Sequence, residues 1–236
     1  MGQYALCVVL LCAFAFGYGL GRSNQTKIDT YVDQIVADAN KQVVDNKLEP
    51  LHLKNFTFKI AKTGISNRDV KANITFGRFE GVSKLRRRGS CRLTVPPLPK
   101  GRSDLAPVAN ITINCNVTFS GVKALVTHGE YKGDTLSGTL KKFSTVTNID
   151  SADMNVTFVG RSGLKGHLSL TVLDRVVLST EFVNAKERPD LNKQRLKNFT
   201  DELNNRLAVQ IFDFASDKYK KFLENATSRK ILPYLV

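Results

Sequence analysis

The functional motif that recurs in this 236-residue chain is the acceptor triplet for N-linked sugar. Eight Asn-x-Thr triplets are present, and none has proline at the middle position. Such triplets accept N-linked glycans when a chain enters the secretory pathway, although a chain rich in Asn and Thr also produces them by chance. The triplets begin at Asn24, Asn55, Asn73, Asn110, Asn116, Asn155, Asn198 and Asn225. We predict that these asparagines are glycosylation sites.

Catalytic and metal-binding patterns are absent from the sequence. The histidines His52, His128 and His167 are far apart, and no Asp, Glu or Cys cluster has the spacing of metal ligands. The stretch from Gly160 to Gly163 lacks the Gly-x-Ser-x-Gly spacing of a nucleophile elbow. No phosphate-binding glycine motif follows a predicted strand. We therefore predict a non-enzymatic protein with no cofactor and no metal.

An apolar, uncharged segment covers residues 4–17. It is short for a membrane span and is followed by small residues, which is typical of a signal peptide. We expect cleavage between Gly17 and Gly21. The sequence thus predicts a signal peptide over residues 1–19 and a single secreted, extracellular domain over residues 20–236. No second long apolar run is present, so we expect no transmembrane anchor.

The net charge of the chain is +14, with a hydrophobic fraction of 42%. The hydrophobic fraction is typical of a globular protein, and about 215 processed residues suffice for one substantial core or two small ones. The charge favours acidic partners such as glycosaminoglycans or anionic lipids. Secretion makes nucleic acid the least favoured of the acidic partners, and we predict that none is bound.

Two of the four cysteines, Cys91 and Cys115, lie outside the predicted signal peptide. An even pair in an oxidising compartment predicts a disulfide, the alternative being two free buried thiols. Apolar residues alternate over 110–119 and over 91–95, and a proline-rich loop signal at 96–104 separates the two stretches. Pairing the cysteines across this hairpin sets Leu93 opposite Ile113, so a single register satisfies the disulfide and the apolar face together.

Helical spacing of apolar residues predicts helices at both ends of the chain. The first covers 27–48, with Thr26 as N-cap and Asp29 in the capping-box position, and it ends before Pro50. The second covers 190–225, opened by Pro189, with one apolar stripe along its length. A helix of that length needs an equally long surface to pack against.

Period-two alternation over about 52–184 predicts six or seven strands in hairpin order, and hence an antiparallel sheet. Gly77 shifts the phase and suggests a bulge, and one long strand is expected from Leu168 to Phe182. In the triplets that fall on strands, the middle residue is apolar. It should point inward, with Asn and Thr on the outer face.

This order of elements resembles the arthropod takeout and juvenile-hormone-binding proteins and the group 7 mite allergens. These families belong to the tubular lipid-binding superfamily, which includes bactericidal/permeability-increasing protein. The resemblance rests on the element order, the chain length, the long helix at 190–226 and stretches such as Leu53–Phe58. A departure is the mid-sheet position of the predicted disulfide, since takeout-like proteins carry one near the mature N-terminus.

The resemblance implies an α+β fold with a long curved antiparallel sheet wrapped around a long C-terminal helix, with a second helix at the N-terminus. It also implies an apolar tunnel for a small hydrophobic ligand of the fatty acid or isoprenoid class. The alternative is that the same residues fill a solid core. The candidate lining residues are Phe56, Phe58, Ile74, Phe76, Ile113, Val117, Leu170, Leu178, Phe199, Leu203 and Phe214.

A basic stretch without acidic residues suggests a rival function. Binding of host polyanions, or of microbial lipid or lipopolysaccharide, would use this stretch on the outer face of a strand. A solvated surface strand is the simpler interpretation. The candidate residues are Lys84, Arg86, Arg87, Arg88 and Arg92, with Lys100 and Arg102 nearby.

Overall fold

The computed structural model describes residues 3–64, 68–96, 110–133 and 138–234. Side chains are described from Ser23 onward, except those of Leu170 and Arg175. The predicted loop at 97–104, with Lys100 and Arg102, lies outside the described residues.

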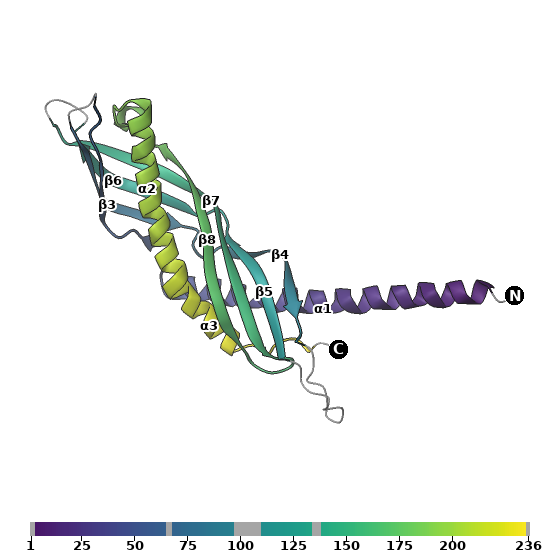
Figure 1. The fold of residues 1–236 in the computed structure, drawn as a ribbon. Helices are drawn as coiled ribbons and strands as arrows, with labels where there is room; N and C mark the ends of the chain where they lie inside the picture. Colours follow the sequence, from purple (N-terminus) through teal and green to yellow (C-terminus); the bar gives the residue numbers. More distant parts are fainter. Residues whose placement is uncertain (1–2, 65–67, 97–109, 134–137, 235–236) are drawn as a thin grey trace.

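The chain begins and ends in helices. They are α1 (Gln3–Asp45), the one-turn helix η1 (Ala185–Glu187), α2 (Lys193–Phe214), the π-helical turn η2 (Ala215–Tyr219) and α3 (Lys220–Ser228). The last three form one long C-terminal helix, as predicted. The first part of α1 extends beyond the rest of the molecule, and the C-terminal helix runs along the strands (Figure 1).

Two predicted helix starts are wrong. Since no proline interrupts residues 3–45, α1 runs through Thr26, which is therefore not an N-cap. The second helix does not begin at Pro189. Its N-cap is Asn192, whose side chain accepts a hydrogen bond from the backbone N–H of Arg195 at 2.9 Å.

In the described part of the chain the strands form one antiparallel sheet of eight strands, one more than the upper end of the prediction. They are β1 (Leu51–His52), β2 (Phe56–Ile60), β3 (Val70–Glu80), β4 (Leu85–Thr94), β5 (Asn110–Phe119), β6 (Lys123–Lys132), β7 (Lys141–Arg161) and β8 (Gly166–Phe182). The strand order is β1-β3-β6-β7-β5-β4, with β2 also on β3 and β8 also on β7.

Strand β7 holds the sheet together. Its first part pairs with β6 and its second part with β5, while β8 pairs along nearly its whole length. With 21 residues, β7 spans about 70 Å if fully extended. The sheet is therefore long enough to match the C-terminal helix that lies along it (Figure 1).

The predicted long strand over 168–182 is confirmed as β8, but its single parity is wrong. The pairing with β7 shifts between Leu173 and Val176. As a result Leu173 packs against the core, whereas Val172 is 47% exposed. An irregularity of this kind bends a strand and lets a long sheet curve.

The helices cover one apolar face of the sheet and share a continuous core with it. Helix α1 packs against β4 and α3, and α2 packs against β2 and β8. The predicted α+β architecture, a long antiparallel sheet combined with a long C-terminal helix and an N-terminal helix, is confirmed.

Candidate functional site

The predicted ligand-binding interior contains a cluster of aromatic rings around Phe199 of α2. The Phe199 ring centroid lies 4.9 Å from that of Phe58 and 5.4 Å from that of Phe143. Tyr131 and Phe182 follow at 6.1 and 6.3 Å. Ring pairs at these distances contact one another directly. At this level the space between α2 and the sheet is thus occupied by side chains.

Most of the predicted lining residues belong to this interior. The buried ones are Phe58, Ile74, Ile113, Val117, Phe199, Leu203 and Phe214. Phe56 and Leu178 are partly buried and pack against the same core. The side chain of Leu170 lies outside the described part of the structure. The structure thus brings nine of the eleven candidates into one apolar core.

Phe76 is the candidate that the structure excludes from the interior, since 48% of it is exposed. The phase shift that the sequence placed at Gly77 begins earlier, between Ile74 and Phe76. Gly77 faces inward instead, where a Cβ would meet Leu53 at 2.5 Å. The register shifts on both sides of Phe76 turn its ring outward, and Gly77 takes the inner position, where Leu53 and the carbonyl of Leu125 leave no room for a side chain.

Two of the three histidines flank the exposed Phe76 ring. The centroid distances are 6.2 Å to His52 and 5.8 Å to His128. His167 lies on β8. Among the described residues, no group of three His, Cys, Asp or Glu side chains could hold a metal ion.

A short polar link crosses the interior between the sheet and α2, and the sequence analysis missed it. The hydroxyls of Thr147 and Thr180 are hydrogen-bonded at 2.6 Å, and Thr180 also donates to the side-chain oxygen of Asn204. The neighbouring Thr145 is buried and its hydroxyl has no hydrogen-bond partner. Because threonine is polar, the sequence did not predict that Thr145 and Thr147 lie on the inner face of β7.

A groove of about 620 Å³ opens where the C-terminal helix passes the connection from α1 to β2. Its apolar side consists of Leu48, Pro50, Leu51 and Phe214, and its polar side of Lys47, His52, Lys54, Gln210, Asp213, Ser216, Asp217 and Lys218. We call it the η2 groove, because three of its residues belong to the π-helical turn η2. Single π turns within α-helices are frequent at functional sites.

Polar contacts fix the rim of the η2 groove. Gln210 bonds the backbone of Lys54 twice, accepting from its N–H at 2.8 Å and donating to its carbonyl at 3.0 Å. The Lys54 ammonium lies 3.4 Å from a carboxylate oxygen of Asp213. At the far rim, the hydrogen bond from Lys221 lowers the pKa of Asp217. Both carboxylates thus already have partners, whereas Lys47 and Lys218 form no ion pair among the described residues.

A second groove, of about 710 Å³, lies between α1 and the C-terminal segment. Its residues include Lys27, Tyr31, Gln34, Ile231 and Tyr234. The Tyr31 ring contacts that of Phe158 at 6.0 Å, and burial raises the pKa of its phenol. This groove is shallower than the η2 groove and has less apolar lining, so the η2 groove is the better apolar site.

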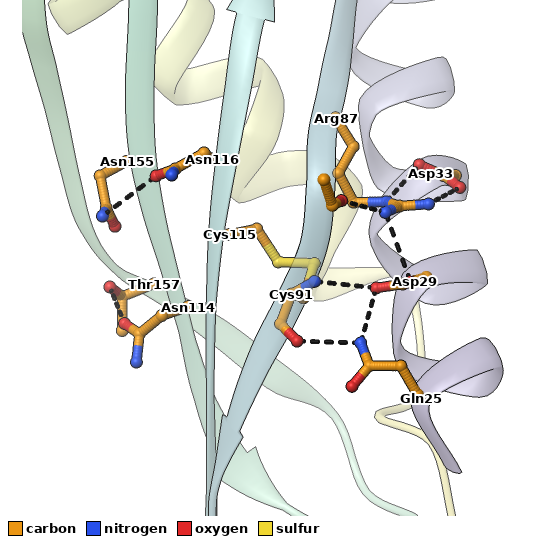
Figure 2. The surroundings of a disulfide bond; sticks show 11 residues. Gln25, Asp29, Asp33, Arg87, Cys91, Asn114, Cys115, Asn116, Asn155 and Thr157 are labelled. Atoms are coloured by element: carbon orange, nitrogen blue, oxygen red, sulfur yellow. Dashed lines mark hydrogen bonds and ion pairs between the residues drawn. A yellow bond between two sulfur atoms is a disulfide. The ribbon is translucent and has the colours of Figure 1, made fainter. Parts of the chain in front are cut away.

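The predicted disulfide between Cys91 and Cys115 is present, and the predicted register of Leu93 opposite Ile113 is confirmed. Figure 2 shows that α1 holds the backbone of Cys91 from the side. The Asp29 carboxylate accepts from the N–H of Cys91 at 2.9 Å, and the Gln25 amide donates to its carbonyl at 2.9 Å. The disulfide and α1 therefore fix the same point of β4.

The basic stretch is not a uniform outer face. Arg87 turns towards α1 and forms two bonds of 2.9 Å with the Asp33 carboxylate (Figure 2). It also lies 3.4 Å from Asp29, and the hydrogen bond to Asp33 raises its pKa. Arg88 forms an ion pair of 2.5 Å with Asp153. Arg87 is thus a structural contact between helix and strand.

The remaining cations of the stretch are exposed. Lys84, Arg86 and Arg92 lie at the surface, and no ion pair is found for them among the described residues. The pairing of β4 with β5 skips residues between Arg88 and Arg92, but the alternation resumes in the same phase.

The strand triplets are oriented as predicted, with the middle residue inward and Asn towards the surface. Asn116 and Asn155 are direct cross-strand partners, and the Asn155 amide donates to the Asn116 side-chain oxygen at 3.4 Å (Figure 2). The triplet at Asn225 lies in α3, where Asn225 donates to Gln42 and Thr227 is fully buried. The triplets are thus unequal in their surroundings.

Comparison with solved structures gives weak likenesses, of which one is described here. A solved structure described as "Crystal structure of lipopolysaccharide binding protein" matches with a TM-score of 0.39 and 14% sequence identity. The match covers 84% of this chain and 36% of that chain, so this chain spans about a third of that protein. No family model matches, and no curated protein matches. The likeness is too weak to assign a family, and the resemblance to takeout proteins and group 7 allergens stays a prediction.

None of the helices in the described part of the chain is long and apolar enough to cross a bilayer.

Proposed function

We propose that this protein is a secreted glycoprotein that binds a small lipid-like ligand, of the fatty acid or isoprenoid class, between the sheet and the C-terminal helix. The observation that carries the proposal is the η2 groove. Phe214 lines the groove and is also 4% exposed and part of the core, and Leu48 and Leu51 pack against the same core. The floor of the groove is therefore also the wall of the apolar interior.

The two sides of the groove suit an amphiphile. An acyl or isoprenoid chain gains free energy by removing apolar area from water at the floor, about 25 cal/mol per Å². The ammonium groups of Lys47, Lys54 and Lys218 lie among the lining residues and suit a carboxylate or phosphate at the rim. The volume lies within the range of about 300–1,000 Å³ that is usual for ligand sites.

The polar link inside the core supports the same proposal. Thr145 and Thr147 are buried, and Thr180 and Asn204 are partly buried, although a buried polar group must be hydrogen-bonded to avoid a cost. A ligand site uses a few such groups to orient its ligand. Asn204 and Phe214 are ten residues apart on one helix, about 15 Å along its axis.

Leu51→Arg is expected to weaken binding of a dansyl-labelled fatty acid by at least about tenfold, because a charge would then lie on the apolar floor of the groove. The measurement is a fluorescence titration of the purified protein. The control is Val209→Arg, which adds the same charge at a position of α2 that is 57% exposed. Equal affinities of the two variants, or a wild type that binds neither fatty acids nor isoprenoids in native mass spectrometry, would contradict the proposal.

Secretion has its own test, which is expression in a eukaryotic secreting cell. We expect the protein in the medium to begin between residues 18 and 22 and to lose mass on enzymatic removal of N-glycans. Peptide mapping should find a glycan on Asn116 or on Asn155 but seldom on both, since cross-strand partners start about 5 Å apart. A chain retained in the cell with its first residues intact and no sugar would rule out this part of the proposal.

The rival function, in which the basic stretch binds host polyanions or microbial lipid, loses support from the ion pairs of Arg87 and Arg88. A variant that removes Arg87 also removes one of the contacts between α1 and β4, the ion pairs with Asp33 and Asp29. A loss of polyanion binding in such a variant would therefore not identify Arg87 as a ligand contact.

A further inference from the structure

Three lysines lie side by side on neighbouring strands, far from the basic stretch in sequence. Lys59 of β2 is the cross-strand partner of Lys71 of β3, and Lys71 is the partner of Lys132 of β6. Directly paired residues point to the same face of a sheet, with Cβ atoms about 5 Å apart. All three side chains are exposed. We call them the lysine row.

The row is electrostatically costly for the folded protein. Like charges directly opposite one another destabilise a sheet, and the middle lysine has one such neighbour on each side. Lys59 forms an ion pair with Asp69 at 2.8 Å, and hydrogen bonds from Lys59 and from the N–H of Lys62 lower the pKa of Asp69. No ion pair is found for Lys71 or Lys132 among the described residues. Two adjacent charges are thus left for an external anion.

The row lies along a groove of about 540 Å³. The other lining residues are Thr57, Phe58, Ala72, Asn73, Glu130, Leu140 and Arg206. Arg206 adds a fourth cation to the lining, and its guanidinium forms an ion pair of 3.0 Å with Glu202. Glu130 is the one carboxylate among the lining residues. The lining holds four cations, but Lys59 and Arg206 are paired with Asp69 and Glu202, so Lys71 and Lys132 are the cations without an ion pair among the described residues.

An exposed leucine ends the row. Tyr131 pairs with Lys141, so the next position in this register sets Lys132 beside Leu140, which is 55% exposed. A sulfated polysaccharide gains nothing from an exposed leucine, whereas a lipid surface offers both phosphate groups and an apolar layer. The stems of the lysines can lie along such a surface while their ammonium groups reach the phosphates.

We propose that the lysine row, with Leu140, docks this protein on the phosphate layer of an anionic phospholipid membrane. The inference is independent of the η2 groove, because it uses none of the residues that line it. A carrier of a lipid-like ligand would gain from such docking, since its ligand enters and leaves at membranes.

The test is co-sedimentation with vesicles of phosphatidylcholine alone or mixed with phosphatidylserine. The variant K71Q/K132Q is compared with K84Q/R86Q, which loses the same charge from exposed positions of the basic stretch. A sugar on Asn73, which lines the groove, would cover the row, so the proposal applies to protein without a glycan at Asn73, and all proteins in the test carry Asn73→Gln. We expect K71Q/K132Q to lose about 30-fold in affinity for phosphatidylserine vesicles, the effect of two lysines at a membrane surface. The control should lose less than about threefold.

Three further measurements identify the cause of a loss of vesicle binding by K71Q/K132Q. The melting temperature of K71Q/K132Q should stay unchanged or rise, because the substitution relieves like-charge repulsion. Leu140→Ser should weaken vesicle binding but not heparin binding. The affinity of K71Q/K132Q for the dansyl-labelled fatty acid should remain that of the wild type, which separates this proposal from that of the η2 groove.

Several outcomes would overturn the proposal. Equal losses in K71Q/K132Q and K84Q/R86Q would show that vesicle binding follows net charge rather than the row. Undiminished vesicle binding by K71Q/K132Q would exclude the row directly. A loss of heparin binding with vesicle binding retained would identify a polysaccharide as the partner instead of a membrane.

Discussion

Replacing Phe199 with alanine is expected to lower the free energy of unfolding by about 3–5 kcal/mol. Phe199 is fully buried and contacts the rings of four other aromatic residues. Removing its ring takes away buried apolar area and leaves a cavity that these neighbours cannot fill without moving. The measurement is equilibrium unfolding in urea with the disulfide intact.

The control for Phe199 is Phe212→Ala on the same helix. Phe212 is 49% exposed, so the loss of its ring should cost well under half as much. The pair of variants also distinguishes a packed core from a cavity wall. A loss of less than about 1.5 kcal/mol for Phe199→Ala would mean that the ring borders open space, as in a preformed tunnel.

The double substitution Cys91→Ser and Cys115→Ser is expected to cost about 3 kcal/mol. The bridge joins residues 24 apart, and opening it gives the unfolded chain more conformations. Asp29 and Gln25 still hold the backbone of Cys91 from α1, so we expect the native register of β4 on β5 to survive. Urea unfolding of the variant gives the cost.

Reduction of the wild-type protein is the matched control for the double serine variant. It should produce the same loss of stability, because both changes open the same bridge. A double serine variant as stable as the oxidised wild type would contradict the expected role of the disulfide. A further loss on adding reductant to the variant would point to thiol chemistry elsewhere in the chain.

Much of the fold could be predicted because it depends on local pattern. Alternation along residues 110–119 placed Ile113 and Cys115 on one face, and the structure pairs them as expected with β4. The stripe of apolar residues after position 193 likewise predicted the long C-terminal helix. The alternation of a strand and the helical spacing of apolar residues each recur several times along an element. A single residue that departs from the pattern therefore does not change the prediction.

The errors come from irregularities that a period cannot reveal. Phe76 fits the alternation of β3, but a bulge beside it turns the ring outward, and Gly77 takes the inner position against Leu53 and the carbonyl of Leu125. Arg87 was a candidate polyanion contact as part of a run of arginines, although alternation sets it on the same face of β4 as Leu85, and carboxylates on α1 bind it there. In both cases the decisive neighbour lies on another element.

The candidate sites show the same limit more strongly. The lysine row joins positions 59, 71 and 132, which become neighbours only through the register of three strands. The η2 groove needs a π turn that the sequence does not indicate, set against residues that precede it by more than 150 positions. Alternation along single strands could predict the core, but no run of residues marks these surfaces.

The contacts between the first and last helices affect how the chain is made. Gln42 bonds the carbonyl of Phe222, 180 residues later, and the Tyr219 phenol donates to Asn40. At about 5–20 residues per second, a ribosome takes roughly 9–36 s to add the intervening residues. Throughout this interval the apolar face of α1 lacks its final cover. We therefore expect chaperones to bind the N-terminal helix of the nascent chain until the C-terminal helix has been synthesised.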